Sequence, residues 1–222
     1  MCGFIELVKK PAKKIEQKLD LQVPLELGSF KCYHPIQIIH SAEQGTKGLN
    51  NQVTKAMWQF LLEQKDGEWK PSKYTSFNSR WYEGKGFKKS FTKAYRETRC
   101  IIPASGFVEG MNKVYHLLTP ADGSPIYFGG LFKNWGDEDN PVYSASMITI
   151  PGHKKLADIH QKAMPLMLPE KDLEMWLDPS FKNTDAFTDL MQPKIRQDFE
   201  AVKIKGWSNL EAVEDGFEIK AD

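Results

Sequence analysis

The sequence predicts an α+β fold that is rich in strands, with a mainly antiparallel sheet or a partly closed barrel and with helices at its periphery. The first reason is the stretch 98–151, where short β-prone runs alternate with Gly, Pro and Asp residues. The second is that helical patterns occur only outside this centre, at residues 11–20 and after Pro169. The third is that no repeat, low-complexity segment or long linker divides the 222 residues, so we expect one domain over 1–222.

The amino-terminal part should combine a surface helix with interrupted strands. Residues 11–20 place Ile15 and Leu19 four positions apart among good helix formers, directly after a proline, which is typical of a short amphipathic helix. Residues 30–43 mix aromatic and β-branched residues around a proline and predict strands with an interruption. Residues 44–54 are rich in Gly, Asn and Thr and predict a turn or loop.

A second helix is expected after Pro169. Acidic residues begin this segment, and an acidic first turn suits the positive end of a helix dipole. Leu173, Trp176 and Leu177 then fall on one face.

Composition limits the classes of partner and compartment. The 30 basic and 29 acidic residues nearly cancel, so nucleic-acid binding would have to come from local clusters. No apolar run approaches the roughly 18 residues of a membrane span, and the start of the chain does not resemble a signal peptide. The three cysteines favour a reducing compartment. We expect a cytoplasmic monomer with no membrane partner, nucleoid-associated on DNA or nuclear in a eukaryote.

One local cluster of charge stands out between residues 80 and 99. Its basic residues are Arg80, Lys85, Lys88, Lys89, Lys93, Arg96 and Arg99, against Glu83 and Glu97. Interleaved with them are Trp81, Tyr82, Phe87, Phe91 and Tyr95. The segment is a candidate phosphate track with base-stacking aromatics, and the nearly equal alternative is that the aromatics are core. The lysines of residues 9–18 are better explained as a solvated helix face.

Cys2 is the most informative position for chemistry. The small residue Gly3 follows it, so methionine aminopeptidase could remove Met1 and leave Cys2 as an exposed amino terminus. An amino-terminal cysteine carries an α-amine with a pKa near ~8 and a thiol with a pKa near ~8.5 on adjacent carbons. This pair can close a thiazolidine ring on an aldehyde. The alternative is that Cys2 is an incidental second residue.

The opening Met-Cys-Gly-Phe resembles two families. One comprises the class II glutamine amidotransferases, in which an amino-terminal cysteine attacks an amide. Their Asn-Gly segment has no convincing counterpart, and residues 134–136 are a poor match. The other is the SOS-response-associated peptidase (SRAP) family, the abasic-site processing proteins.

Three further stretches resemble the SRAP family in the right order. Residues 77–80, with Glu83 just beyond, resemble its Asn-Ala-Arg-x-Glu segment. Residues 99–109 resemble its Arg-Cys-hydrophobic-Pro segment, which ends in Gly-aromatic-aromatic-Glu. Residues 149–160, followed by 164–168, resemble its Thr-to-His and Met-Pro-hydrophobic segments. The resemblance spans residues 2 to about 177, and four ordered motifs are far more specific than one.

The resemblance implies an enzyme that forms a covalent thiazolidine crosslink between Cys2, after removal of Met1, and the ring-opened abasic site in single-stranded DNA. Lyase chemistry through a Schiff base, self-reversal and a thiol autopeptidase activity belong to the same expectation. Asn78 would hold the Cys2 amine for attack on the sugar aldehyde. Glu109 would shuttle protons, and His160 would exchange protons with the sugar oxygens.

Further roles follow from the same resemblance. Arg80 would bind a backbone phosphate, Gly3 and Thr149 would line the pocket, and Trp69 would stack on a base. Three departures concern Phe4, where the family commonly has Arg; Gly110, where it usually has Trp; and the loop 161–163.

No cofactor and no metal are expected. Cys32, His34 and His40 lack a second ligand pair with metal-site spacing, and Cys100 is expected to be packed in a strand. Two other functions remain open. One is an autoprocessing or amide-cleaving thiol hydrolase, and the other is a non-covalent single-strand binding module.

Overall fold

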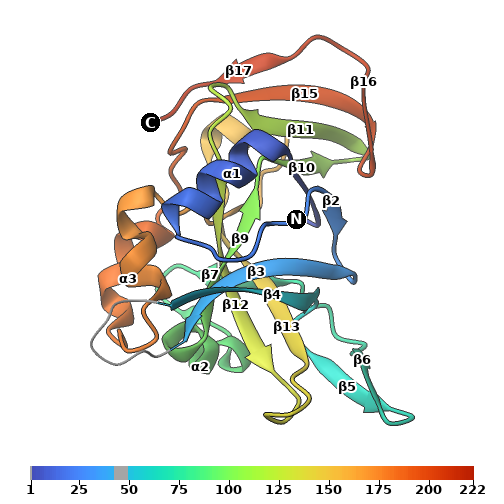
Figure 1. Cartoon of the computed structure of the whole chain (residues 1–222). Coiled ribbons are helices and arrows are strands. Elements are labelled where there is room, and N and C mark those ends of the chain that lie inside the picture. Colours follow the sequence, from blue (N-terminus) through green and yellow to red (C-terminus); the bar gives the residue numbers. More distant parts are fainter. Residues whose placement is uncertain (1, 43–49) are drawn as a thin grey trace.

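The computed structural model describes residues 2–42 and 50–222, and two sheets organise them (Figure 1). The first sheet has the strand order β16-β15-β11-β10-β1-β2, with β17 also paired to β15, and every pairing is antiparallel. Its strands are β1 (Phe4–Leu7), β2 (Gly28–Lys31), β10 (Gly106–Met111), β11 (Val114–Pro120), β15 (Phe199–Gly206), β16 (Asn209–Ala212) and β17 (Phe217–Ile219).

The second sheet closes on itself. Its order is β12-β9-β3-β4-β13-β7-β8, and β12 also pairs with β13, so that β12, β9, β3, β4 and β13 form a ring. Its strands are β3 (Pro35–Ala42), β4 (Asn50–Trp58), β7 (Asn78–Tyr82), β8 (Gly86–Phe87), β9 (Arg99–Ala104), β12 (Ile126–Asn134) and β13 (Tyr143–Pro151), and β14 (Ala163–Pro165) pairs with β13. Only β13 makes parallel pairings among the described strands, with β4 and β7. The predicted α+β class with a mainly antiparallel, partly closed barrel is confirmed.

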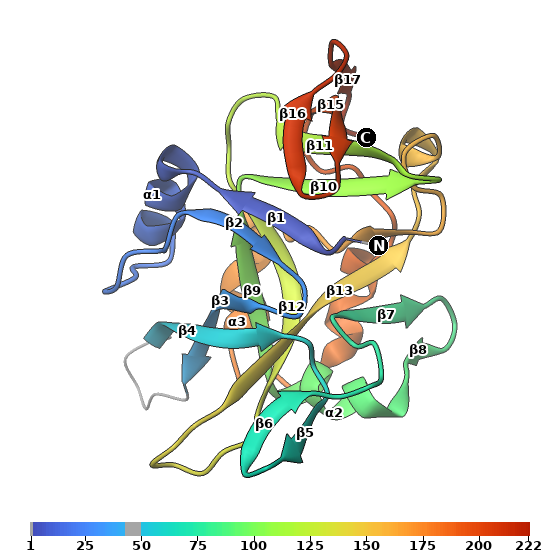
Figure 2. The same ribbon diagram turned by 90° about the vertical axis from the view of Figure 1, so that its right-hand side faces the viewer.

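A separate hairpin and the helices lie at the periphery. The hairpin β5 (Leu62–Lys65) and β6 (Glu68–Pro71) projects at the bottom of both views (Figures 1 and 2). The helices are α1 (Lys9–Lys18), α2 (Lys89–Glu97) and α3 (Leu173–Leu177), with 3₁₀ turns η1 (Lys154–Leu156), η2 (Glu170–Asp172) and η3 (Thr184–Met191). Within the described residues, no helix is long and apolar enough to cross a membrane.

Both predicted helices are present, with shifted ends. α1 begins two residues before the predicted 11–20, because Pro11 sits in the first turn, where a missing N–H leaves no helical hydrogen bond unmade. Ile15 and Leu19 are buried, and the lysines of α1 are solvent-exposed as expected. After Pro169, Leu173 and Trp176 are buried as predicted.

The loop predicted for residues 44–54 is wrong where it can be compared. Residues 50–54 belong to strand β4, and the remainder of that prediction, residues 44–49, lies outside the described residues. β4 pairs with β3 from Asn50 to Met57, so a long antiparallel ladder overrides the turn-like composition. The interrupted strands predicted for 30–43 are confirmed, since β2 and β3 are separated by a short turn.

The interpretation of residues 80–99 as one phosphate track is wrong at its carboxyl end. Arg99 is only 4% exposed, and its guanidinium donates to five backbone carbonyls. These belong to Tyr95, Arg96, Trp176, Asp178 and Phe181. Phe91 is buried, and the Tyr95 ring packs 4.8 Å from that of Phe87. These side chains therefore build the core beneath α2, which was the alternative explanation, and Arg99 fixes α3 to β9.

The two sheets meet around the amino-terminal strand. β1 lies between β10 and β2, and Figure 2 shows its start between β10 of the first sheet and β13 of the second. Parallel pairing sets Asn78 of β7 beside Met147 of β13 and Arg80 beside Thr149. Residues separated by up to about 150 positions in the chain are thus brought to one place.

Candidate functional site

Cys2 lies at this meeting point and is fully buried, with 0% of its surface exposed. The sequence led us to expect an exposed terminus, and this expectation is wrong because neighbouring strands flank the start of β1 on both sides. The thiol donates weakly to the carbonyl oxygen of Phe4 at 3.8 Å. Burial, reinforced by the negative charge of Glu109, raises the pKa of the Cys2 thiol well above its usual value. The thiol is therefore protonated at neutral pH.

Asn78 contacts Cys2 directly. Its side-chain Nδ2 donates to the Cys2 carbonyl oxygen at 3.0 Å. Its Oδ1 is buried and has no hydrogen-bond partner among the described residues. The strand end is fixed because the Phe77 carbonyl accepts from the Trp58 indole and from the Met147 amide, each at 3.0 Å. Asn78 thus holds the Cys2 backbone through its Nδ2, and its Oδ1 can accept a further hydrogen bond.

Glu109 lies on β10 and is 4% exposed. Burial raises the pKa of its carboxyl group to about 7, while hydrogen bonds from the backbone amides of Gly110 and Cys2 oppose that rise. The carboxyl group therefore lies close to the Cys2 backbone nitrogen. This nitrogen is the atom that becomes the α-amine when Met1 is removed.

His160 follows η1 and is half-buried. Its Nδ1 lies 3.2 Å from the carbonyl oxygen of Gly110, the residue next to Glu109. Because a carbonyl can only accept, Nδ1 carries the proton and Nε2 of the neutral ring keeps a lone pair. Burial, with the positive charges of Arg80 and Lys162 adding to it, lowers the pKa of His160. The imidazole is therefore neutral at physiological pH.

The remaining predicted residues differ in their relation to this centre. Arg80 of β7 donates from Nη2 to the Lys162 carbonyl at 2.6 Å, so its guanidinium group lies against the loop that follows His160. Thr149 is buried opposite Arg80 on β13. The Gly3 carbonyl accepts from the Cys32 amide at 2.9 Å beside Cys2. Trp69 instead lies on the separate β5–β6 hairpin, where its ring packs 5.2 Å from that of Trp135.

The sequence did not indicate a cleft that adjoins this centre. Its volume is about 320 Å³, and it is lined by Gly3, Phe4, Cys32, Phe77, Val108, Gly110, Tyr115 and Trp207. The last two residues lie on β11 and after β15, outside every recognisable motif. The one sequence signal for Trp207 is a tryptophan in a polar, turn-like Gly-Trp-Ser-Asn segment.

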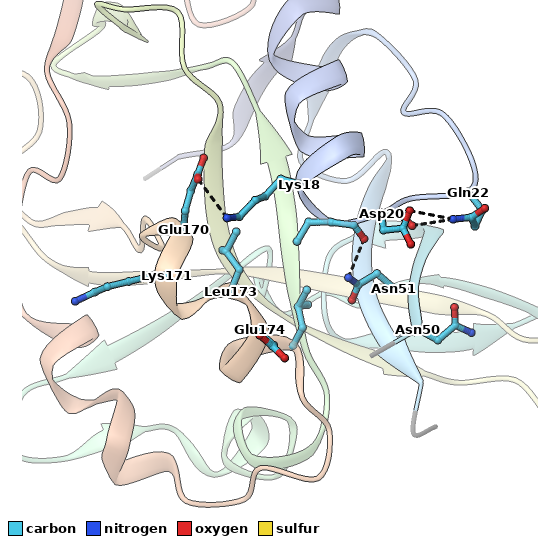
Figure 3. A pocket seen from close by; sticks show the side chains of 11 residues that line it. Lys18, Asp20, Gln22, Asn50, Asn51, Glu170, Lys171, Leu173 and Glu174 are labelled. Carbon is cyan, nitrogen blue, oxygen red and sulfur yellow. Dashed lines mark hydrogen bonds and ion pairs between the residues drawn. The ribbon is translucent and has the colours of Figure 1, made fainter. Parts of the chain in front are cut away.

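A larger cavity of about 500 Å³ lies elsewhere, between α1, β4 and the η2–α3 segment (Figure 3). It is lined by both acidic and basic side chains, with Lys18 3.6 Å from Glu170 and the Asn51 amide donating to the Leu19 carbonyl. None of the predicted site residues lines it. The larger volume of this cavity is therefore no evidence that it is the functional site.

The two histidines near Cys32 in the sequence, His34 and His40, have other partners. His34 Nδ1 lies 3.1 Å from the Cys32 carbonyl, and His40 Nε2 lies 2.9 Å from the Thr54 hydroxyl. Cys100 is buried in β9, as expected for a packed thiol. In residues 2–42 and 50–222, no group of three or more His, Cys, Asp or Glu side chains could hold a metal ion.

The strand-rich fold therefore gathers Cys2, Asn78 and Glu109 where its two sheets meet, with His160 beside Gly110. The chain belongs to the SOS response associated peptidase (SRAP) family, whose sequence profile matches residues 1–209.

Relatives agree with this assignment. The chain is 30% identical over 223 aligned positions to the abasic site processing protein YoqW of Bacillus subtilis strain 168, with 94% of each chain covered. It is 29% identical to the abasic site processing protein YobE of the same organism, with 94% of this chain and 96% of YobE covered.

Solved structures share the fold. A protein from Bordetella bronchiseptica matches with a TM-score of 0.69 at 19% identity, with 92% of this chain and all of that chain covered. A protein from Bacteroides thetaiotaomicron also matches with a TM-score of 0.69, at 20% identity and 92% coverage of both chains. The architecture is thus common to proteins of low sequence identity.

Proposed function

We propose that this protein processes abasic sites in single-stranded DNA by forming a thiazolidine crosslink through Cys2 after Met1 has been removed. The observation that carries the proposal is the position of Cys2, whose carbonyl oxygen accepts from the Asn78 side chain at 3.0 Å beside the buried carboxyl group of Glu109. Residues 1–222 act as one domain in this proposal, because one apolar core runs from Cys2 to Ile219. The relatives named as abasic site processing proteins support the choice of substrate.

The amine is the first nucleophile in this mechanism. The Cys2 thiol is held protonated, whereas an α-amine with a pKa near ~8 is partly neutral at cellular pH. The unpartnered Oδ1 of Asn78 can accept a hydrogen bond from this amine, and the Asn78 amide already fixes the Cys2 carbonyl. Attack of the amine on the C1′ aldehyde gives a carbinolamine.

Glu109 then moves the protons. With a pKa of about 7, it can take a proton from the attacking nitrogen and return it to the departing hydroxyl group, which leaves as water and gives an imine. The Cys2 sulfur adds to the imine carbon, and the thiol proton passes to the imine nitrogen. The net reaction joins an aldehyde and an aminothiol into a thiazolidine and one water. Lyase cleavage and self-reversal would branch from the same imine.

His160 and Arg80 act on the sugar and the phosphate. The Nε2 lone pair of neutral His160 can accept a proton from a sugar hydroxyl during ring opening. Arg80 supplies positive charge beside it for a backbone phosphate. Gly3 and Thr149 line the pocket that takes the sugar, and Trp69 stacks on or wedges against a more distant base.

The alternative of an amide-cleaving thiol hydrolase needs a thiolate nucleophile, and burial of Cys2 works against that species. Incubation with an oligonucleotide that contains one abasic site distinguishes the candidates. We expect a heat-stable band of lower mobility in denaturing gels. A band that disappears on denaturation would instead indicate a non-covalent binding module, and amide cleavage without any adduct would indicate the hydrolase.

Arg80→Ala should weaken DNA binding and reduce its dependence on salt. One phosphate contact on single-stranded DNA contributes a slope of about −0.7 in a plot of log affinity against log salt concentration. The measurement is fluorescence anisotropy with an unreactive abasic analogue at several salt concentrations. Lys13→Ala, which removes an exposed charge on the solvated face of α1, serves as the control. If the variant keeps the wild-type slope, Arg80 does not bind phosphate.

A further inference from the structure

The cleft beside Cys2 adjoins the candidate catalytic residues on three sides. Three of its lining residues are the immediate chain neighbours of the residues given roles above: Gly3 follows Cys2, Phe77 precedes Asn78, and Gly110 follows Glu109. The Gly110 carbonyl also lies 3.2 Å from the ring nitrogen of His160. A group that occupies this cleft therefore lies next to the position where the reacting sugar must sit.

The wall of the cleft is aromatic and uncharged. None of the eight residues that line it has a side chain that is charged at neutral pH, and the set includes Phe4, Phe77, Tyr115 and Trp207. Cys32 lines it with a thiol whose pKa burial raises, so it too is neutral. Such a surface disfavours a phosphate group and favours a flat apolar ring.

Trp207 is held in place for stacking. It occupies the two-residue turn between β15 and β16, where Gly206 pairs with Asn209. Its ring meets that of Phe4 edge-on, with centroids 6.0 Å apart and planes at 83°. Phe4 itself is buried in a small apolar cluster with Val108 and Ile204. The ring that Trp207 packs against is therefore fixed in position. Yet 39% of Trp207 remains exposed.

Gly110 determines the shape of the other wall. A Cβ atom at this position would lie 2.5 Å from Cδ1 of Tyr115 and 2.5 Å from the Val114 carbonyl oxygen. Because residue 110 has no side chain, the Tyr115 ring packs against its backbone. The Tyr115 ring therefore forms part of the aromatic wall, together with Phe4, Phe77 and Trp207.

We propose that this cleft binds the nucleobase of the nucleotide adjacent to the abasic residue, stacked on Trp207. The proposal rests on the proposed function, because it takes the substrate to be single-stranded DNA that reacts at Cys2. Base–aromatic stacking tolerates every base, since each base has a flat π face. The cleft positions the strand, and it sets a requirement for a base on one side of the lesion.

The first test measures stacking without any covalent step. An oligonucleotide carries a tetrahydrofuran residue, which has no aldehyde, with the fluorescent base 2-aminopurine on its 5′ or its 3′ side. We expect binding to quench 2-aminopurine on one side with the wild type and not with Trp207→Ala. Equal quenching by the two proteins, or quenching on neither side, would overturn the proposal even if crosslinking occurs.

The second test measures reaction rate on a true abasic site. Replacing the neighbouring base by tetrahydrofuran should slow the wild type about 10-fold, in keeping with the loss of one stacking contact. Trp207→Ala should show the same loss on the unmodified strand and no additional loss on the modified one. Trp207→Phe should retain most of the rate. If the loss from Trp207→Ala and the loss from removing the neighbouring base were additive, that base would not stack on Trp207.

Phe217→Ala is the matched control, because Phe217 is an aromatic residue that is 47% exposed on the same sheet but does not line the cleft. It should match the wild type in both tests. Wild-type quenching without any crosslink would contradict the proposed function and leave the base site supported. Crosslinking that does not depend on the neighbouring base or on Trp207 would support the proposed function and contradict the base site.

Discussion

Cys2→Ala should reduce the stable crosslink to background while leaving a reducible one. The variant keeps an α-amine at the chain end, so an imine can still form on the abasic aldehyde, but no sulfur can close the ring. We expect an adduct only when borohydride is present, together with strand cleavage by β-elimination. The measurement is a time course on an abasic oligonucleotide with and without borohydride. A heat-stable adduct without borohydride would show that the aminothiol mechanism is wrong.

Two controls belong with this experiment. Cys100→Ala removes a thiol that is buried in β9, and it should keep the wild-type yield once its folding has been checked by circular dichroism. The intact mass of the wild-type crosslink should lack Met1, since an acylated Cys2 nitrogen cannot form an imine. Crosslinked protein that retains Met1 would contradict the amine as nucleophile.

Glu109→Gln should slow crosslinking by roughly 10²-fold, the usual size of a general acid–base contribution. The amide keeps the shape of the side chain but cannot take or return a proton, so the same thiazolidine forms slowly. The reagent itself is intact, and the final yield should approach that of the wild type. Glu97→Gln, which alters a carboxylate on α2 with 40% of its surface exposed, is the control.

The pH dependence should change as well. The productive state of the wild type holds one proton between the amine and Glu109, whose pKa burial raises to about 7. Below this pH both groups are protonated, and above the amine pKa near ~8 neither can act as an acid, so the rate should be bell-shaped. Glu109→Gln should remove the alkaline descent, and its rate should rise with amine deprotonation alone. A variant that matches the wild type in rate and profile would exclude Glu109 as the proton shuttle.

The sequence by itself determined the class of the fold and the motifs that assign the family. Alternating β-prone runs between residues 98 and 151 predicted strands β9 to β13, and the helical face containing Leu173 and Trp176 is buried as expected. Local patterns suffice here because period-2 and period-3.6 burial depends on the order of neighbouring residues alone. Two residues of the ordered motifs, Asn78 and Glu109, are brought next to Cys2 by the fold.

Only the tertiary structure decided how those residues meet. The turn-like composition of residues 50–54 is overridden by the hydrogen-bonded ladder with β3. Arg99 belongs to a cluster of charged residues in the sequence, but in the fold it is buried and donates to five backbone carbonyls. Burial of Cys2, the raised pKa of Glu109 and the cleft under Trp207 all depend on contacts between distant segments. Desolvation is a property of the packed environment, and one sequence without its fold does not contain that information.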